Sequence, residues 1–184
     1  MDADTILDTA LALAAERGWR QATLSDIAAQ TGCGLAEVYR HFPSKGAIAR
    51  AAVARIDAAV LSEAGADDGD TFRDRLFDLL MRRYDALKPY RTAIEALWRD
   101  LRRDSLAGAL LAPALIRSMS RMLEAAGAPL RTPFALLRVK LLVGVRVSVM
   151  RVWLQDDSED LGRTMARLDK ALKRWACVLE GRRG

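Results

Sequence analysis

The spacing of the apolar residues constrains the fold of this chain more than any other feature. Apolar side chains recur at intervals of three and four residues through nearly the whole sequence, and runs of β-branched residues are scarce. This period places the apolar side chains on one face of an α-helix, whereas a half-buried strand alternates every second residue. The sequence therefore predicts an all-α protein of about nine helices.

Residues that break or cap helices set the expected boundaries. A first helix of about 14 residues should end at Gly18, because glycine tolerates a positive φ. Thr23 and Asp26 form a variant of the capping box for a second helix, which should end at Gly32. Ser44 should cap a long helix. The remaining helices are expected at 35–41, 71–87, 90–103, 105–126, 133–155 and 158–179.

The second half of the chain carries further boundary signals. The polar segment 65–70 should separate the N-terminal helices from the rest. Pro113 should kink or split the helix at 105–126. Thr132, followed by Pro133 at the first helical position, should begin the next helix, and the pair at 157–158 should cap the last one.

Residues 24–42 predict a DNA-binding module. They read LSDIAAQTGCGLAEVYRHF, which is two short apolar-periodic segments joined by Gly32. Two short helices joined by a tight glycine turn and preceded by a helix are typical of a helix-turn-helix, whose second helix lies in the major groove. The residues expected to point inward are Ile27, Leu35 and Val38.

The segments 23–32 (TLSDIAAQTG) and 38–45 (VYRHFPSK) resemble the N-terminal module of the TetR family of transcriptional regulators. The likeness covers roughly residues 3–55 and extends to the length and all-α character of the chain. It implies a helix-turn-helix module at 1–46 and a helical ligand-binding and dimerisation domain at 47–184. It also implies a homodimer whose affinity for operator DNA changes when a small apolar or amphipathic ligand binds.

The same resemblance implies which residues meet DNA. They are Thr23, Leu35, Ala36, Glu37, Tyr39, Arg40, His41 and Lys45. Residues 35–40 would occupy the recognition helix, and Tyr39 and Lys45 match the family's phosphate-contacting tyrosine and lysine. A phenol and an ammonium hydrogen-bond phosphate oxygens well, and an arginine can read guanine or touch phosphate.

Several of these residues also have structural interpretations. Tyr39 could only pack its ring on the first helix, and His41 is expected to be packed or capping. Thr23 is an N-cap, and Cys33 is a small turn residue.

The distribution of charge weakens the case for DNA. The chain carries a net charge of +5, but residues 1–64 hold six basic and eight acidic residues and so are −2. The other residues hold 23 basic and 16 acidic ones, which gives +7. Because phosphate neutralisation supplies most non-specific affinity, the prediction of DNA binding depends on the helix-turn-helix residues alone.

The end of the chain predicts a dimer interface. Apolar residues follow one another at spacings of 4, 3, 4, 3 and 4 at Leu161, Met165, Leu168, Leu172, Trp175 and Leu179. The preceding helix has an apolar face of its own, and an antiparallel pair of such helices suits a four-helix interface between two subunits. The alternative is an ordinary intramolecular core.

The segment 131–155 is also rich in basic residues. It holds five of them with no acid among them: Arg131, Arg138, Lys140, Arg146 and Arg151. They could face an anionic ligand or membrane headgroups. The favoured interpretation is structural, with pairing to the acidic residues at 156–160 of the partner or of neighbouring helices.

Residues 153–172 carry a second, shorter resemblance, to the C-terminal region of the ubiquinone-biosynthesis accessory proteins. These resemble TetR proteins in fold but bind isoprenoid lipid instead of DNA. The likeness implies an alternative function, an isoprenoid- or quinone-type lipid-binding protein with little or no DNA binding. Candidate ligand-binding residues, which need no ligand if they are simply core, are Trp98, Met119, Met122, Met150 and Trp153.

The remaining composition limits compartment and chemistry. The chain has one histidine and two widely separated cysteines, Cys33 and Cys177, which supply neither a metal cluster nor a disulfide framework. The first residues are acidic, and the longest uncharged run, 105–116, has 12 residues, too few for a membrane span. We therefore expect a cytoplasmic protein that is not an enzyme, uses no cofactor or metal and does not insert stably into membranes.

Overall fold

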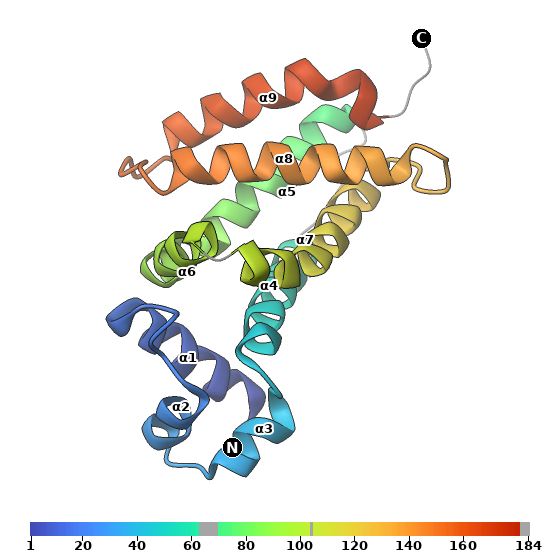
Figure 1. Cartoon of the computed structure of the whole chain (residues 1–184). Coiled ribbons are helices and arrows are strands. Elements are labelled where there is room, and N and C mark those ends of the chain that lie inside the picture. Colours follow the sequence, from blue (N-terminus) through green and yellow to red (C-terminus); the bar gives the residue numbers. More distant parts are fainter. Residues whose placement is uncertain (63–69, 104, 181–184) are drawn as a thin grey trace. The chain divides into compact units, whose positions relative to one another are not determined.

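The computed structural model describes residues 1–62, 70–103 and 105–180 (Figure 1). Helices are the only regular elements in these ranges, which confirms the all-α prediction. The predicted breaker at 65–70 lies outside the described residues except for Asp70. Among the described residues, we find no helix with the length and hydropathy that a membrane span requires.

The chain forms two compact units, and each unit is built from two separate stretches of the sequence. Unit 1 comprises Met1–Arg55 and Leu87–Ala114, and unit 2 comprises Ile56–Ala86 and Leu115–Gly184. The predicted division at residues 46 and 47 concerns where the DNA-binding module ends, and it stays a prediction. Two helices, α4 and α7, contribute to both units.

Unit 1 contains three short N-terminal helices together with helices from the middle of the chain. Its elements are α1 (Ala3–Arg17), α2 (Leu24–Thr31), α3 (Leu35–His41), the first part of α4 (Lys45–Ser62), η1 (Lys88–Tyr90), α6 (Arg91–Arg103) and the first part of α7 (Ser105–Ala125). Helix α1 packs against both α2 and α6. A continuous apolar core that includes Ile6, Leu13, Ile27, Val38 and Ile48 joins α1 to α4.

Local capping explains why the first helices begin and end where the sequence predicts. The Thr23 side chain accepts from the backbone N–H of Asp26, while the Asp26 carboxylate accepts from the backbone N–H of Thr23, so the capping box is complete. Gly32 ends α2 in the left-handed conformation, with φ of 70°. The Ser44 hydroxyl accepts from the N–H of Ala47 at the start of α4. These predicted boundaries are confirmed.

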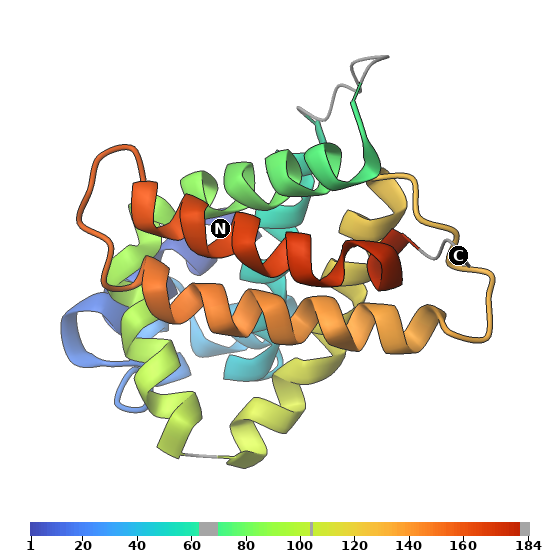
Figure 2. The same ribbon diagram turned by 90° about the horizontal axis from the view of Figure 1, so that it is seen from above.

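Unit 2 contains the second part of α4, α5 (Phe72–Leu87), the second part of α7, α8 (Ala135–Trp153) and α9 (Gly162–Glu180). Helices α8 and α9 run antiparallel and lie side by side in both views (Figures 1 and 2). Helix α5 ends at Leu87, before Pro89, as expected from the restriction on residues that precede proline.

Helix α7 runs through Pro113 from Ser105 to Ala125, so the proline does not split it, and the kink stays a prediction. Two predicted boundaries in the second half are wrong. Helix α8 begins at Ala135, because 131–134 form a turn and the Thr132 hydroxyl accepts from Arg138 instead of capping the helix.

The last helix also starts later than predicted. It begins at Gly162, not near residue 158, because residues 154–161 form a loop in which Leu161 has a φ of 54°. The Asp156 carboxylate holds this loop by accepting from both the N–H and the hydroxyl of Thr164, each at 2.7 Å.

Candidate nucleic-acid interface

Helix α3 presents one face to the core of unit 1 and the other to solvent. Val38 is buried in α3, and Phe42 is buried immediately after it. Leu35, Ala36, Tyr39, Arg40 and His41 are exposed. The expectation that Leu35 points inward is therefore wrong, since its exposed fraction is 37%. The structure leaves most of the predicted reading residues on the accessible face of a short second helix, as a helix-turn-helix requires.

Tyr39 and His41 are accessible to a partner. The side chain of Tyr39 is 50% exposed, so half of its surface is open to a partner. His41 is exposed beside the Phe42 ring, with the two centroids 6.4 Å apart, so it is not buried in the core, and the capping alternative stays a prediction. Both side chains can hydrogen-bond phosphate oxygens from these positions.

Glu37 is held away from base reading by ion pairs. One carboxylate oxygen, Oε1, lies 3.0 Å from the amino group of Met1 and 3.2 Å from Nη2 of Arg40. The hydrogen bond from the Met1 amino group lowers the pKa of Glu37, so the carboxylate stays ionised. The two cations offset its repulsion of phosphate, and Arg40 remains mostly exposed.

Lys45 points into its own unit. Its ammonium donates to the backbone carbonyls of Trp19 and Arg20, the second at 3.1 Å, and lies 5.2 Å from the centroid of the Trp19 indole. Burial lowers the pKa of Lys45. In this conformation the ammonium fastens the loop between α1 and α2 to the start of α4, and the predicted phosphate contact stays a prediction.

Thr23 is committed to its helix. Its hydroxyl donates to Oδ2 of Asp26 at 2.6 Å and accepts from the Asp26 backbone at 3.1 Å. The Thr23 contacts lower the pKa of Asp26, which keeps a negative charge at the start of α2. The N-cap interpretation is confirmed, and the predicted phosphate contact of Thr23 is untested.

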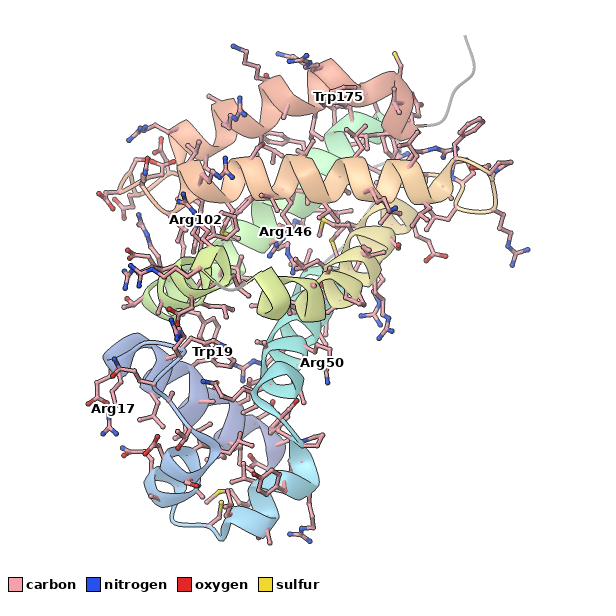
Figure 3. The ribbon with its side chains drawn as sticks, in the orientation of Figure 1. Arg17, Trp19, Arg50, Arg102, Arg146 and Trp175 are labelled. Carbon is pink, nitrogen blue, oxygen red and sulfur yellow. The ribbon has the colours of Figure 1, made fainter. Side chains whose placement is uncertain are left out.

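The basic residues of unit 1 are spread over several helices. Arg17 ends α1 and Arg50 lies on α4 (Figure 3). Arg55 pairs with Asp8, at 2.6 Å, and donates to the Tyr90 hydroxyl at 3.0 Å. On α3 itself, Arg40 supplies a positive charge, and the Met1 amino group lies beside Glu37 of the same helix.

The predicted ligand-binding residues divide between the two units. Met119, Met122, Met150 and Trp153 are buried in unit 2. Trp98 is half-buried on α6 of unit 1. The first four are buried core residues. Their burial agrees both with a ligand site and with an ordinary core that needs no ligand.

The predicted dimer seam divides between core and surface. Leu161, Leu168, Leu172 and Leu179 are buried inside unit 2, as the intramolecular alternative requires. Met165 is 40% exposed and Trp175 half-buried. The apolar face expected on the preceding helix is exposed where α8 begins, since Phe134 and Leu137 are each more than half exposed, and so is Leu136 beside them.

Sequence reasoning also missed a buried polar cluster in unit 2, formed by Asp57, Arg83 and Arg146. A signal was present, because Arg83 and Arg146 stand at positions where the three-and-four period of α5 and α8 calls for an apolar core residue. Of the five basic residues in the run from 131 to 151, Arg138 and Arg146 are buried.

One of the predicted acidic partners of this basic run is buried in the loop before α9, and the others are exposed. Asp156 is buried and binds Ser158 and Thr164. The other three acids at 156–160 are exposed.

Comparisons with known proteins agree with this geometry. A model of the tetR family of bacterial regulatory proteins matches residues 6–52. No curated protein matches the chain. The C-terminal resemblance to lipid-binding accessory proteins therefore stays a prediction.

Solved structures share the fold of the whole chain. The TetR transcriptional regulator from Nitrosomonas europaea ATCC 19718 superposes with a TM-score of 0.76 at 25% identity, covering 95% of this chain and 97% of that one. A TetR transcriptional regulator from Rhodococcus sp. RHA1 gives a TM-score of 0.71 at 22% identity, covering 93% of each chain. The domain match assigns the DNA-binding helix-turn-helix of the tetR family to residues 6–52, and the rest of the chain shares the fold of these regulators.

Proposed function

We propose that this protein is a ligand-responsive transcriptional regulator that binds operator DNA as a homodimer. The observation that carries the proposal is the exposed face of α3, where Tyr39 and Arg40 stand free of the core in a TetR-family helix-turn-helix. In this role α3 enters the major groove, Arg40 contacts a base edge or phosphate, and Tyr39 fixes the register. A catalytic step is not part of the proposal.

Ligand response requires that one molecule bind the two states of the dimer with different affinity. We place the ligand in the apolar part of unit 2 that holds Met119, Met122, Met150 and Trp153, because flexible thioethers and a broad ring adapt to an apolar molecule. Binding there would change the separation of the two recognition helices and hence the affinity for an operator.

The test is a titration of DNA from around the protein's own gene, followed by fluorescence anisotropy at several salt concentrations. Arg40→Ala should weaken binding by about 1–3 kcal/mol, and Tyr39→Phe, which removes only the hydroxyl, should weaken it less. Arg167→Ala is the matched control, since it removes one exposed positive charge from α9. Equal effects of Arg40→Ala and Arg167→Ala would show that α3 does not read DNA.

The second candidate is the isoprenoid- or quinone-type lipid-binding protein with little DNA binding. It is favoured by the net charge of −2 on residues 1–64 and by the inward direction of Lys45. It predicts an apolar lipid in the native mass spectrum of the purified protein, together with no retained DNA at low salt. Saturable binding to one DNA fragment would reject it.

A further inference from the structure

The buried cluster of unit 2 contains more positive than negative charge. Asp57 on α4 accepts from Nη1 of Arg83 on α5 and, at 2.7 Å, from the hydroxyl of Ser118 on α7. Arg146 on α8 is the third charged member, and all three side chains are almost fully buried. Two guanidinium groups and one carboxylate leave one positive charge without a counter-ion in the interior.

A fourth charged group faces the cluster from its edge. Arg121 on α7 lies with Nη1 3.7 Å from Oδ2 of Asp57, and its side chain is 47% exposed. Arg121 therefore shares the Asp57 carboxylate with Arg83, so less of the negative charge is available to balance the buried arginines. Water can solvate Arg121, so the imbalance concerns Arg83 and Arg146.

The buried groups that lack hydrogen-bond partners in this cluster belong to Arg146 and Arg83. Among the described residues, the buried Nε atoms of both arginines have no hydrogen-bond partner, and Arg146 makes no ion pair. The Tyr84 hydroxyl donates to the backbone carbonyl of Arg146 at 3.2 Å and leaves the guanidinium free. Burial, followed by the nearby charge of Arg83, lowers the pKa of Arg146 to about 10, so the group is still a cation at neutral pH.

The same helix shows how a buried arginine is normally satisfied. Arg138 is also buried, but its Nη1 donates to the carbonyl of Pro129 at 2.9 Å and its Nη2 donates to the Thr132 hydroxyl at 2.7 Å. Arg146 has no such partners and points from α8 into unit 2 (Figure 3). Asp57 is close enough to act on Arg146 by its charge but forms no ion pair with it. A buried cation that lacks a direct ion pair and hydrogen-bond acceptors is costly to the folded protein. The cost is understandable if a bound anion removes it.

The neighbourhood of Arg146 is apolar. Val149, Met150 and Trp153 follow it within two turns of α8 and are buried, and Met119 and Met122 are buried on α7. The Trp153 ring lies 6.0 Å from the ring of Tyr84, whose hydroxyl reaches Arg146. Arg146 therefore shares a helix face with buried apolar residues, and the buried thioether side chains of unit 2 adapt easily in shape.

We propose that unit 2 binds an apolar monocarboxylate, whose carboxylate pairs with the guanidinium groups of Arg146 and Arg83 while its hydrocarbon part lies among the methionines and Trp153. A single negative charge cancels the single excess positive charge of the cluster. A planar carboxylate also matches the paired N–H donors of a guanidinium. The inference rests on the proposed function, because it names the chemical class of the ligand for that regulator.

The test uses decanoate, decan-1-ol and decyl phosphate as probes on the full chain, by isothermal calorimetry and thermal unfolding. Decanoate should bind and raise Tm, decanol should bind at least about tenfold more weakly, and decyl phosphate should be weaker than decanoate because its second charge is unmatched. Arg146→Met should weaken decanoate binding about tenfold or more, and Arg146→Lys, which keeps a charge, should retain part of it. Equal binding of decanoate and decanol, or tighter binding of decyl phosphate, would overturn the proposal.

Thermal unfolding without any probe gives a second readout. Arg146→Met should leave Tm unchanged or raise it, because it removes a buried cation without a partner, whereas the matched control Arg138→Met should lower it. An equal fall in both variants would show that Arg146 is only structural and would overturn the proposal.

The two hypotheses fail separately. If the wild-type protein without a probe binds no operator DNA, the proposed regulatory function is rejected, and carboxylate binding can still be measured. Absence of decanoate binding in a protein that retains its operator would reject only the ligand class.

Discussion

Asp156 shows how one side chain can fix a loop. Its two oxygens accept from Thr164 and, at 2.5 Å and 3.4 Å, from the hydroxyl and N–H of Ser158. Burial raises the pKa of Asp156, but these hydrogen bonds outweigh it and lower the pKa to about 2. A carboxylate whose folded pKa is depressed stabilises the protein above its unfolded pKa of about 4, and this contribution is lost as the pH falls towards 2.

We therefore expect Asp156→Asn to lower the free energy of unfolding at pH 7 by about 2 kcal/mol, since hydrogen bonds to a charged acceptor are lost. The variant should also lose less stability than wild type between pH 5 and pH 2. Urea unfolding at pH 7, 5, 3 and 2 measures both effects. Asp160→Asn is the control, because Asp160 is exposed in the same loop. A parallel pH profile for wild type and Asp156→Asn would contradict the assignment.

The start of α4 is fastened to a distant part of the chain, the loop between α1 and α2. Lys45 reaches back to the carbonyls of Trp19 and Arg20, and the N–H of Arg20 donates to Asp100 on α6 at 2.7 Å. The loop between α1 and α2 is thus fixed from two sides. This loop leads into α2, and α2 packs against α3.

Replacing Lys45 by methionine should lower the free energy of unfolding by about 1–2 kcal/mol, because two carbonyls lose a charged donor that is only half buried. Guanidinium unfolding measures the change, and Lys170→Met on the exposed side of α9 is the control. Unchanged stability combined with a shallower salt dependence of DNA binding would instead support the phosphate contact implied by the family resemblance.

The exposed apolar group formed by Phe134, Leu136 and Leu137 predicts that the protein associates with a second copy of itself. Contiguous exposed apolar side chains at the start of a long helix mark an interaction surface more often than a solvated one. Leu137→Glu should convert a dimer to a monomer in sedimentation equilibrium, because a carboxylate would be buried in the contact. Lys170→Glu is the control and should leave the dimer intact, because it changes the charge by more than Leu137→Glu but at an exposed position of α9. A Leu137→Glu protein that remains dimeric would place the interface elsewhere.

The sequence predicts the elements of this chain well where the signals are local. Gly18, Gly32 and the pair Thr23 and Asp26 act within a few residues of themselves, and the boundaries of α1, α2 and α3 agree with the prediction. The starts of α8 and α9 depend on the contacts of Arg138 with Thr132 and of Asp156 with Thr164, which span a loop. A local pattern does not contain such contacts.

The candidate sites show the same contrast. The exposure of Tyr39 and Arg40 follows from the period of α3, with Val38 on its buried face. The inward direction of Lys45 depends on where a distant loop places its carbonyls, and the lack of a partner for Arg146 depends on which helices surround it. Neither could be obtained from spacing along one helix.

The interleaving of the two units limits how this protein can be divided. Unit 1 takes its residues from two separate stretches, since α1 packs against α6 as well as against α2. A fragment that stops after α3 would expose the face of α1 that α6 covers. Grafting unit 1 onto another protein therefore requires both stretches, joined by a new linker in place of residues 56–86. A protein built this way cannot be recombined by exchanging a simple N-terminal segment.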